Sequence, residues 1–111
     1  MHKLSLQATA RELGSQAATS ANGRSARTVY GGHEATLRQT VIAMTAGTHL
    51  AEHENPGDAT VQVLSGRFRL ESGTDTWEGR QGDLLRVPRA RHALHCLEDG
   101  AVLLSAAARP A

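Results

Sequence analysis

The sequence predicts an all-β fold, a sandwich or barrel, preceded by a short helix or arm. Three observations indicate this fold. From about residue 30 onward, short runs alternate apolar with polar residues and contain β-branched side chains. Groups of Gly, Pro, Asn and Asp, which favour turns, separate these runs. The length of 111 residues suits one domain with a core of its own.

The N-terminal part differs from this pattern. Leu6, Ala10 and Leu13 recur at near-helical spacing, and a glycine that can end a helix follows at position 14. We therefore expect a short helix within residues 4–18.

A loop is expected after this helix, because residues 19–27 are rich in Ser, Asn and Gly. We assign residues 1–28 to the N-terminal helix or arm with its loop. Residues 29–108 are assigned to the β-barrel domain.

Seven runs in the rest of the chain are expected to be strands. The segment Pro56-Gly57-Asp58 predicts a turn, because proline presets φ and glycine accepts positive φ. The segment Glu98-Asp99-Gly100 predicts another turn before the last run. The expected strands cover residues 35–44, 49–55, 59–72, 76–79, 83–88, 91–98 and 101–107.

Composition excludes several classes of function. The chain has 12 basic and 11 acidic residues and no basic stripe interleaved with aromatics, so we expect no nucleic-acid partner. No apolar run approaches the ~20 residues that span a bilayer, and the N-terminus lacks the apolar stretch of a signal peptide. We therefore expect a cytoplasmic protein without a membrane partner. Cys96 is the single cysteine, which excludes an internal disulfide, and we expect it to be buried as a small hydrophobe.

Two motifs carry the functional information. In the first, Gly47 is followed by five residues and then His53. Asn55 stands two residues later, Ala59 follows four residues on, and Gly66 ends the motif.

The second motif follows later in the chain. Gly82 is followed by five residues and then Pro88, after which come Ala90 and His92. In this order, within a small β-rich chain, the two motifs resemble the signature motifs of the cupin family.

In that family the motifs read G-x5-H-x-H-x3,4-E-x6-G and G-x5-P-x-G-x2-H-x3-N. This chain has Asn55 and Ala59 at the places of the second histidine and the glutamate, while Ala90 replaces the second motif's glycine and its histidine comes one residue early. The resemblance covers roughly residues 41–105, and the whole chain is also similar to small single-domain (RmlC-like) cupins of largely unassigned function. It implies a double-stranded β-helix, the cupin jelly roll, with a short N-terminal helix or arm.

The resemblance also implies a pocket in the barrel mouth. Alternation along a strand places His53 and Asn55 on one face. If both motif strands line the barrel as in cupins, His92 faces the interior with them. The expected pocket residues are His53, Asn55, Ala59, Val61, Val63, His92 and Leu94.

These residues predict a degenerate metal site. Two imidazoles and one amide oxygen form a poor cage, and Ala59 supplies no ligand. The alternative is a divalent metal (Zn, Mn, Fe or Ni) held by His53 and His92, with water at the open positions.

Three functions stay open. The favoured one is a metal-independent cupin that binds a small molecule, such as a sensor or accessory protein. The second is a divalent-metal-dependent enzyme of dioxygenase or isomerase type. The third is a structural or interaction protein whose barrel is filled by its own side chains. By analogy with the fold, we also expect a homodimer.

Two further residues interrupt the apolar pattern. Turned inward, the guanidinium of Arg86 would bind an anion, since it can hold a carboxylate in a bidentate fork. Because Arg86 alternates with Leu85 and Val87, we expect it to face solvent or a dimer interface instead. The single tryptophan, Trp77, is expected in a core or interface position.

Overall fold

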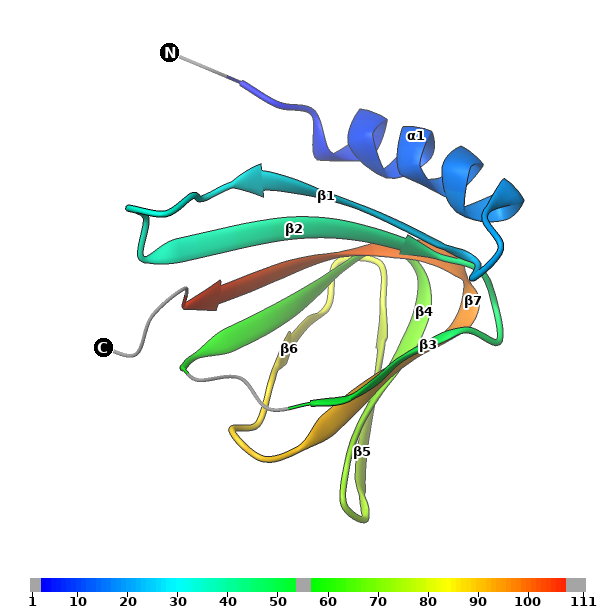
Figure 1. Ribbon diagram of the computed structural model, residues 1–111. Coiled ribbons are helices and arrows are strands. Elements are labelled where there is room, and N and C mark those ends of the chain that lie inside the picture. The colour runs from blue at the N-terminus through cyan, green and yellow to red at the C-terminus, as the bar shows by residue number, and fades with distance from the viewer. Residues whose placement is uncertain (1–2, 54–56, 108–111) are drawn as a thin grey trace.

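The structure, a computed structural model, describes residues 3–53 and 57–107. Of residues 52 and 53 it describes the backbone alone. One helix is followed by seven strands, which confirms the predicted all-β fold with a short N-terminal helix (Figure 1). The elements are α1 (Leu6–Thr19), β1 (Arg24–Tyr30), β2 (Leu37–Met44), β3 (His49–His53), β4 (Ala59–Ser72), β5 (Asp75–Arg80), β6 (Leu84–Arg86) and β7 (His92–Ala107).

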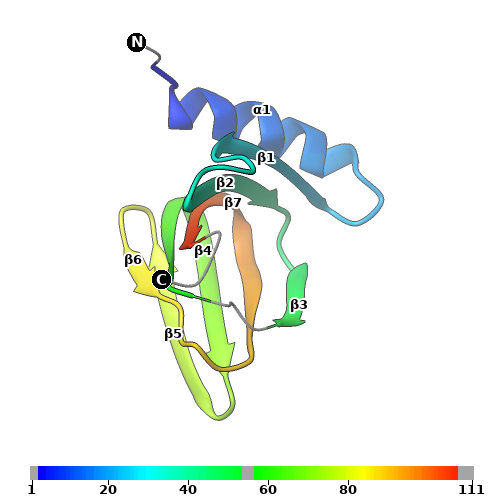
Figure 2. The same cartoon turned by 60° about the vertical axis from the view of Figure 1, so that its left-hand side comes forward.

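The two longest strands, β4 and β7, organise the sheet. All the strand pairs in the described chain are antiparallel, in the order β1-β2-β7-β4-β5. In addition, β3 pairs with the first half of β7, and β6 pairs with the start of β4. Because each long strand changes partner along its length, the sheet curls around an interior (Figures 1 and 2).

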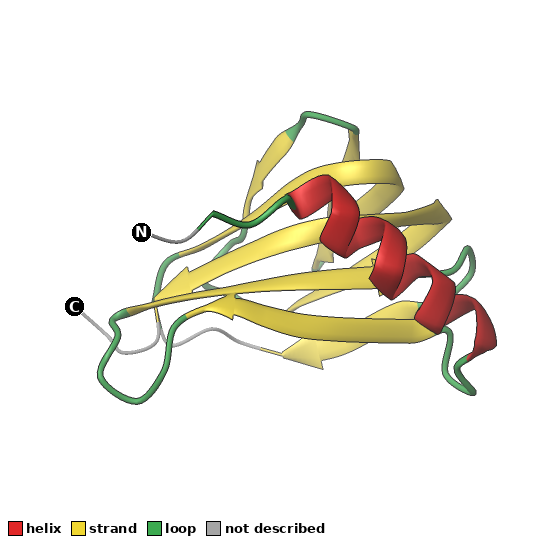
Figure 3. Cartoon of the chain, turned by 90° about the horizontal axis from the view of Figure 1, so that it is seen from above, coloured by secondary structure: helices red, strands yellow, loops and turns green. Residues whose placement is uncertain are grey.

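Helix α1 forms in the segment that the sequence predicts and covers the outside of the sheet, but Gly14 lies inside the helix and does not end it. The Ser5 hydroxyl oxygen accepts a hydrogen bond from the Ala8 N–H at 3.1 Å, which caps the first turn. Thr9, Leu13 and Ala17, each four residues apart, form its buried stripe. Figure 3 shows the helix lying across the strands. Within the described ranges, no helix has the length and apolar character that crossing a membrane requires.

The sheet is buried on both faces where the helix covers it. In β2, Val41 and Ala43 pack outward in a cluster with Leu13, while Ile42 and Met44 pack inward. The continuous apolar run at positions 41–44 is the pattern expected of a strand with two covered faces. The fold therefore has two hydrophobic clusters, one inside the barrel and one beneath α1.

Two glycines permit the crossing of β4 and β7. Gly66 has φ of +78°, and a Cβ added there would lie 2.5 and 2.6 Å from the carbonyl oxygens of Asp99 and Glu98. A Cβ at Gly100 would collide with the Ser65 carbonyl oxygen. The β4–β7 register also shifts between positions 63 and 68. These features mark a bulge at a barrel corner, where only glycine lets the two backbones approach so closely.

Two predictions about the strands were wrong. The loop expected at residues 19–27 ends at Gly23, and β1 begins at Arg24. Tertiary contacts select the strand, because β1 pairs with β2 along its length and Arg27 forms an ion pair with Glu12 of α1 at 3.0 Å. The turn expected at residues 98–100 lies inside β7, because its glycine serves the close approach to β4 and does not reverse the chain.

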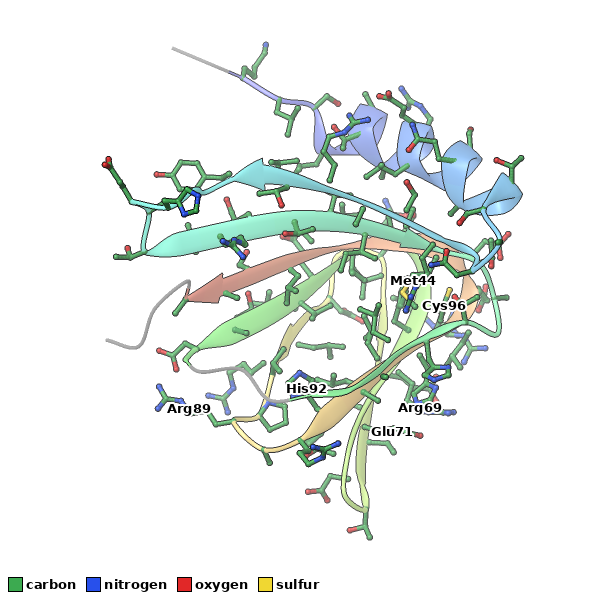
Figure 4. All side chains as sticks on the ribbon, in the orientation of Figure 1. Met44, Arg69, Glu71, Arg89, His92 and Cys96 are labelled. Atoms are coloured by element: carbon green, nitrogen blue, oxygen red, sulfur yellow. The ribbon has the colours of Figure 1, made fainter. Side chains whose placement is uncertain are left out.

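Cys96 belongs to the inner cluster, as predicted. It is 2% exposed, and its sulfur lies 3.1 and 3.4 Å from the carbonyl oxygens of Glu98 and Met44, which share its single S–H. Cys96 and Met44 lie side by side in Figure 4. Burial, together with the charge of Asp99, raises the pKa of the Cys96 thiol to about 11.

The close approach of β4 and β7 at Gly66 and Gly100 predicts that one added methyl group lowers the stability of the fold. Gly100→Ala should lower the free energy of unfolding by about 2–4 kcal/mol, because the new Cβ meets backbone atoms that cannot rotate away. Urea denaturation measures this change. Gly32→Ala is the control, since a Cβ there meets nothing within 4 Å, and its effect should stay within about 0.5 kcal/mol. Equal midpoint urea concentrations for the two variants would show that a Cβ at Gly100 does not disturb the β4–β7 contact.

The cluster beneath the helix gives a second prediction. Leu13→Ala should cost about 2–4 kcal/mol, because this 1% exposed side chain fills the space between α1 and β2. Leu4→Ala, at a position 50% exposed, should have little effect. If both variants unfold at the same urea concentration, α1 does not stabilise the sheet.

The Cys96 thiol should be unreactive in the folded protein. With a pKa near 11, only about one thiol in a thousand is ionised at pH 8, and burial blocks access as well. The thiol reagent dithiobis(nitrobenzoate) should therefore release one equivalent of thionitrobenzoate only after urea is added. Rapid release from the native protein would show that this part of the barrel opens.

Candidate functional site

The inside of the barrel holds a small cavity with one polar side chain in its described lining. That side chain is His92, the first residue of β7, which is 4% exposed. The other lining residues are aliphatic: Ile42, Leu50, Val61, Leu70, Val87, Leu94, Val102 and Leu104.

The chain before β7 fixes the orientation of the His92 ring. Its Nδ1 lies 2.9 Å from the carbonyl oxygen of Ala90. A carbonyl only accepts, so Nδ1 donates and the lone pair of the neutral ring is on Nε2. The hydroxyl of Ser72, the last residue of β4, donates to the Arg91 carbonyl at 2.8 Å and fastens the same segment. This arrangement suits a ring that accepts a hydrogen bond or holds a metal through Nε2.

The cavity is nearly filled by the side chains around it. Its volume is about 20 Å³, which is room for roughly one water molecule. Sites for organic ligands usually measure about 300–1,000 Å³. A metabolite therefore does not fit within the barrel as it stands, and a ligand that contacts His92 would do so from the mouth.

Several of the predicted pocket residues come together in the interior. Val61 and Leu94 line the cavity with His92. Ala59 and Val63 belong to the same inner cluster without lining the cavity. These positions follow from strand alternation, and a ligand-binding role for them stays a prediction.

The remaining predicted residues are less fully defined. The backbone of His53 in β3 lies opposite that of His92 in β7. Asn55 lies outside the described residues. The backbones of the two predicted metal ligands are thus paired across β3 and β7.

The described residues do not make up a complete metal site. Ala59, at the place of the family's glutamate, is 8% exposed in an apolar cluster and offers no donor atom. Among the described side chains, no three His, Cys, Asp or Glu residues are grouped so as to hold an ion. Among the described side chains at this place, His92 is the one with a donor atom, and we assign no reaction step to a metal.

A second polar cluster, outside the predicted pocket, lies on the outer face of the sheet. The rings of His49 and His95 stack with centroids 5.4 Å apart. His95 Nε2 lies 2.8 Å from a Glu71 carboxylate oxygen, and Arg69 Nε lies 3.0 Å from the other oxygen, an ion pair in which the N–H is not aligned for a hydrogen bond. Figure 4 shows Arg69 and Glu71 apart from His92.

The sequence held a signal for this outer cluster. Arg69 and Glu71 alternate with the buried Phe68 and Leu70 along β4, so they share the outward face. The partner strands could not be known from this alternation. The cluster joins β3, β4 and β7 from outside and does not line the cavity of His92.

Comparison with known proteins gives structural neighbours only. No protein-family model matches the chain, and no curated protein matches it. A conserved protein of unknown function from Streptococcus pyogenes is 27% identical, with a TM-score of 0.72 over 83% of this chain and 79% of that chain.

Two other neighbours are cupins. A cupin superfamily protein from Desulfitobacterium hafniense is 16% identical, with a TM-score of 0.70 over 76% of each chain. An RmlC-like cupin from Shewanella frigidimarina is 18% identical, with a TM-score of 0.69 over 78% of this chain and 77% of that chain. The topology and these neighbours confirm the resemblance carried by the two motifs: the chain is a small protein with the cupin fold, a jelly-roll barrel that begins with a helix.

Proposed function

We propose that this chain binds a small molecule at the mouth of its barrel, with the imidazole of His92 as the polar contact. The burial of this ring carries the proposal. His92 loses its hydration among aliphatic side chains, and it is held in one orientation by the Ala90 carbonyl. An aliphatic residue would fill the same space without that cost. A binding role accounts for the polar group at this position.

The surroundings indicate the chemistry of the ligand. When the ring that donates from Nδ1 to Ala90 is neutral, its lone pair is on Nε2, and the complementary group of a ligand is a hydroxyl or N–H. The aliphatic walls suit an apolar body next to that group. Since the cavity has room for about one water, only a small part of the ligand passes below His92.

A metal-dependent enzyme is the second candidate, and one observation favours it. Residues that lie opposite in an antiparallel pair have Cβ atoms about 4.5–5.5 Å apart, and His53 lies opposite His92 in the β3–β7 pair. Two histidines at this spacing suit one ion. The filled barrel is the third candidate, favoured by the cavity volume of about 20 Å³.

Thermal unfolding of untagged protein distinguishes the three functions. We expect at least one member of a panel of small alcohols, amines and hydroxy acids to raise the melting temperature by several degrees. A ligand at about 100 times its Kd adds roughly 2.7 kcal/mol to the free energy of unfolding. His92→Gln should abolish that shift, whereas His33→Gln, at an exposed position before β2, should retain it.

The same measurement with Zn²⁺, Mn²⁺, Fe²⁺ or Ni²⁺ tests the alternative. Stoichiometric metal in the purified protein, lost in a His53→Ala/His92→Ala double variant, would replace the metal-free proposal by the metal-dependent one. No shift with any compound or metal would favour the filled barrel. Far-UV circular dichroism of each variant without ligand shows whether the barrel has folded.

A further inference from the structure

A larger hollow lies between β5 and β6, which we call the β5–β6 groove. It has a volume of about 600 Å³, within the usual range of organic ligand sites. It shares only Val87 with the cavity of His92, so it is a separate place on the molecule. Its lining is Asp58, Ala59, Thr60, Trp77, Leu84, Leu85, Arg86, Val87 and Pro88.

The walls of the groove are apolar and partly exposed. Trp77 is 42% exposed and Leu84 is 60% exposed, so the tryptophan predicted for a core or interface is not in the core. An indole face and a leucine side chain beside a proline offer a surface for a hydrocarbon or aromatic group.

The charges of the groove favour an anion. Asp58 is paired with Arg89 outside the lining, at 2.6 Å. The guanidinium of Arg86 makes no hydrogen bond or ion pair within the described part of the chain, and it is exposed, as the alternation of β6 predicts. The unneutralised charge of the lining is therefore one guanidinium, which binds a carboxylate through two parallel hydrogen bonds.

We infer that the β5–β6 groove binds a small amphipathic carboxylic acid. The carboxylate lies on Arg86, and the hydrocarbon part packs on Trp77 and Leu84. A cationic ligand is disfavoured because Arg89 neutralises Asp58. This site goes beyond the function proposed above and does not depend on it.

Octanoate is a suitable probe, because it has one carboxylate and an aliphatic tail without fluorescence. Trp77 is the single tryptophan of the chain, so its emission reports on the groove alone. We expect a saturable change in emission, with half-saturation at millimolar concentration or below. Arg86→Gln should raise that concentration at least tenfold, since it removes a charge-assisted hydrogen bond.

Matched controls distinguish binding through the Arg86 charge from nonspecific hydrophobic binding and from binding at the His92 site. Octan-1-ol should bind at least tenfold more weakly than octanoate, and Arg38→Gln, an exposed change on β2, should bind octanoate like the unaltered protein. His92→Gln should also leave the octanoate titration unchanged, so this test stands even if the cavity proposal fails.

Three outcomes would overturn the inference. The first is equal binding of octanoate by the unaltered protein and Arg86→Gln. The second is equal binding of octanoate and octan-1-ol. The third is a Trp77 emission that changes with protein concentration alone, together with a dimer in sedimentation, which would assign the groove to a second copy of the chain.

Discussion

The close approach of β4 and β7 at Gly66 and Gly100 is the constraint on which the rest of this structure depends. These two strands provide pairing edges for the rest of the sheet: β2 and β3 pair with β7, and β5 and β6 pair with β4. Without a Cβ at the crossing, both strands bend and still pair on each side of the corner. A straight pair would leave an open sheet with no interior, and His92 would lie on an exposed surface.

The interior formed in this way is a packed core rather than a large empty cavity. Aliphatic side chains fill it, with Phe68 at 0% exposure as its aromatic member. The helix seals the opposite face of β2, so that this strand is buried on both sides. The stability of the barrel therefore comes from two layers of apolar contact. The ligand contacts that we propose therefore lie at the mouth and on the outside.

The polar groups described above consequently lie in three separate places on the molecule. His92 is at the mouth with an oriented ring, the stacked histidines lie on the outer face, and the guanidinium of Arg86 lies in a groove. No three metal-ligand side chains of the described residues are grouped so as to hold an ion. The two ligand sites that we propose therefore lie at different places on the molecule, one at the mouth and one in the groove.

The sequence by itself determined the helix, most strands and the inward residues, because spacing of 3.6 or 2 residues is a local property. It also placed His92 in the interior through the second motif. Only the tertiary structure decided the rest. β1 forms from a polar segment because β2 offers it a partner edge and Arg27 pairs with Glu12. The glycine at position 100 favours a turn locally, yet it lies within a strand because the Ser65 backbone crosses there. The groove of Trp77 and Arg86 joins residues from different strands, and no local pattern shows which strands become neighbours.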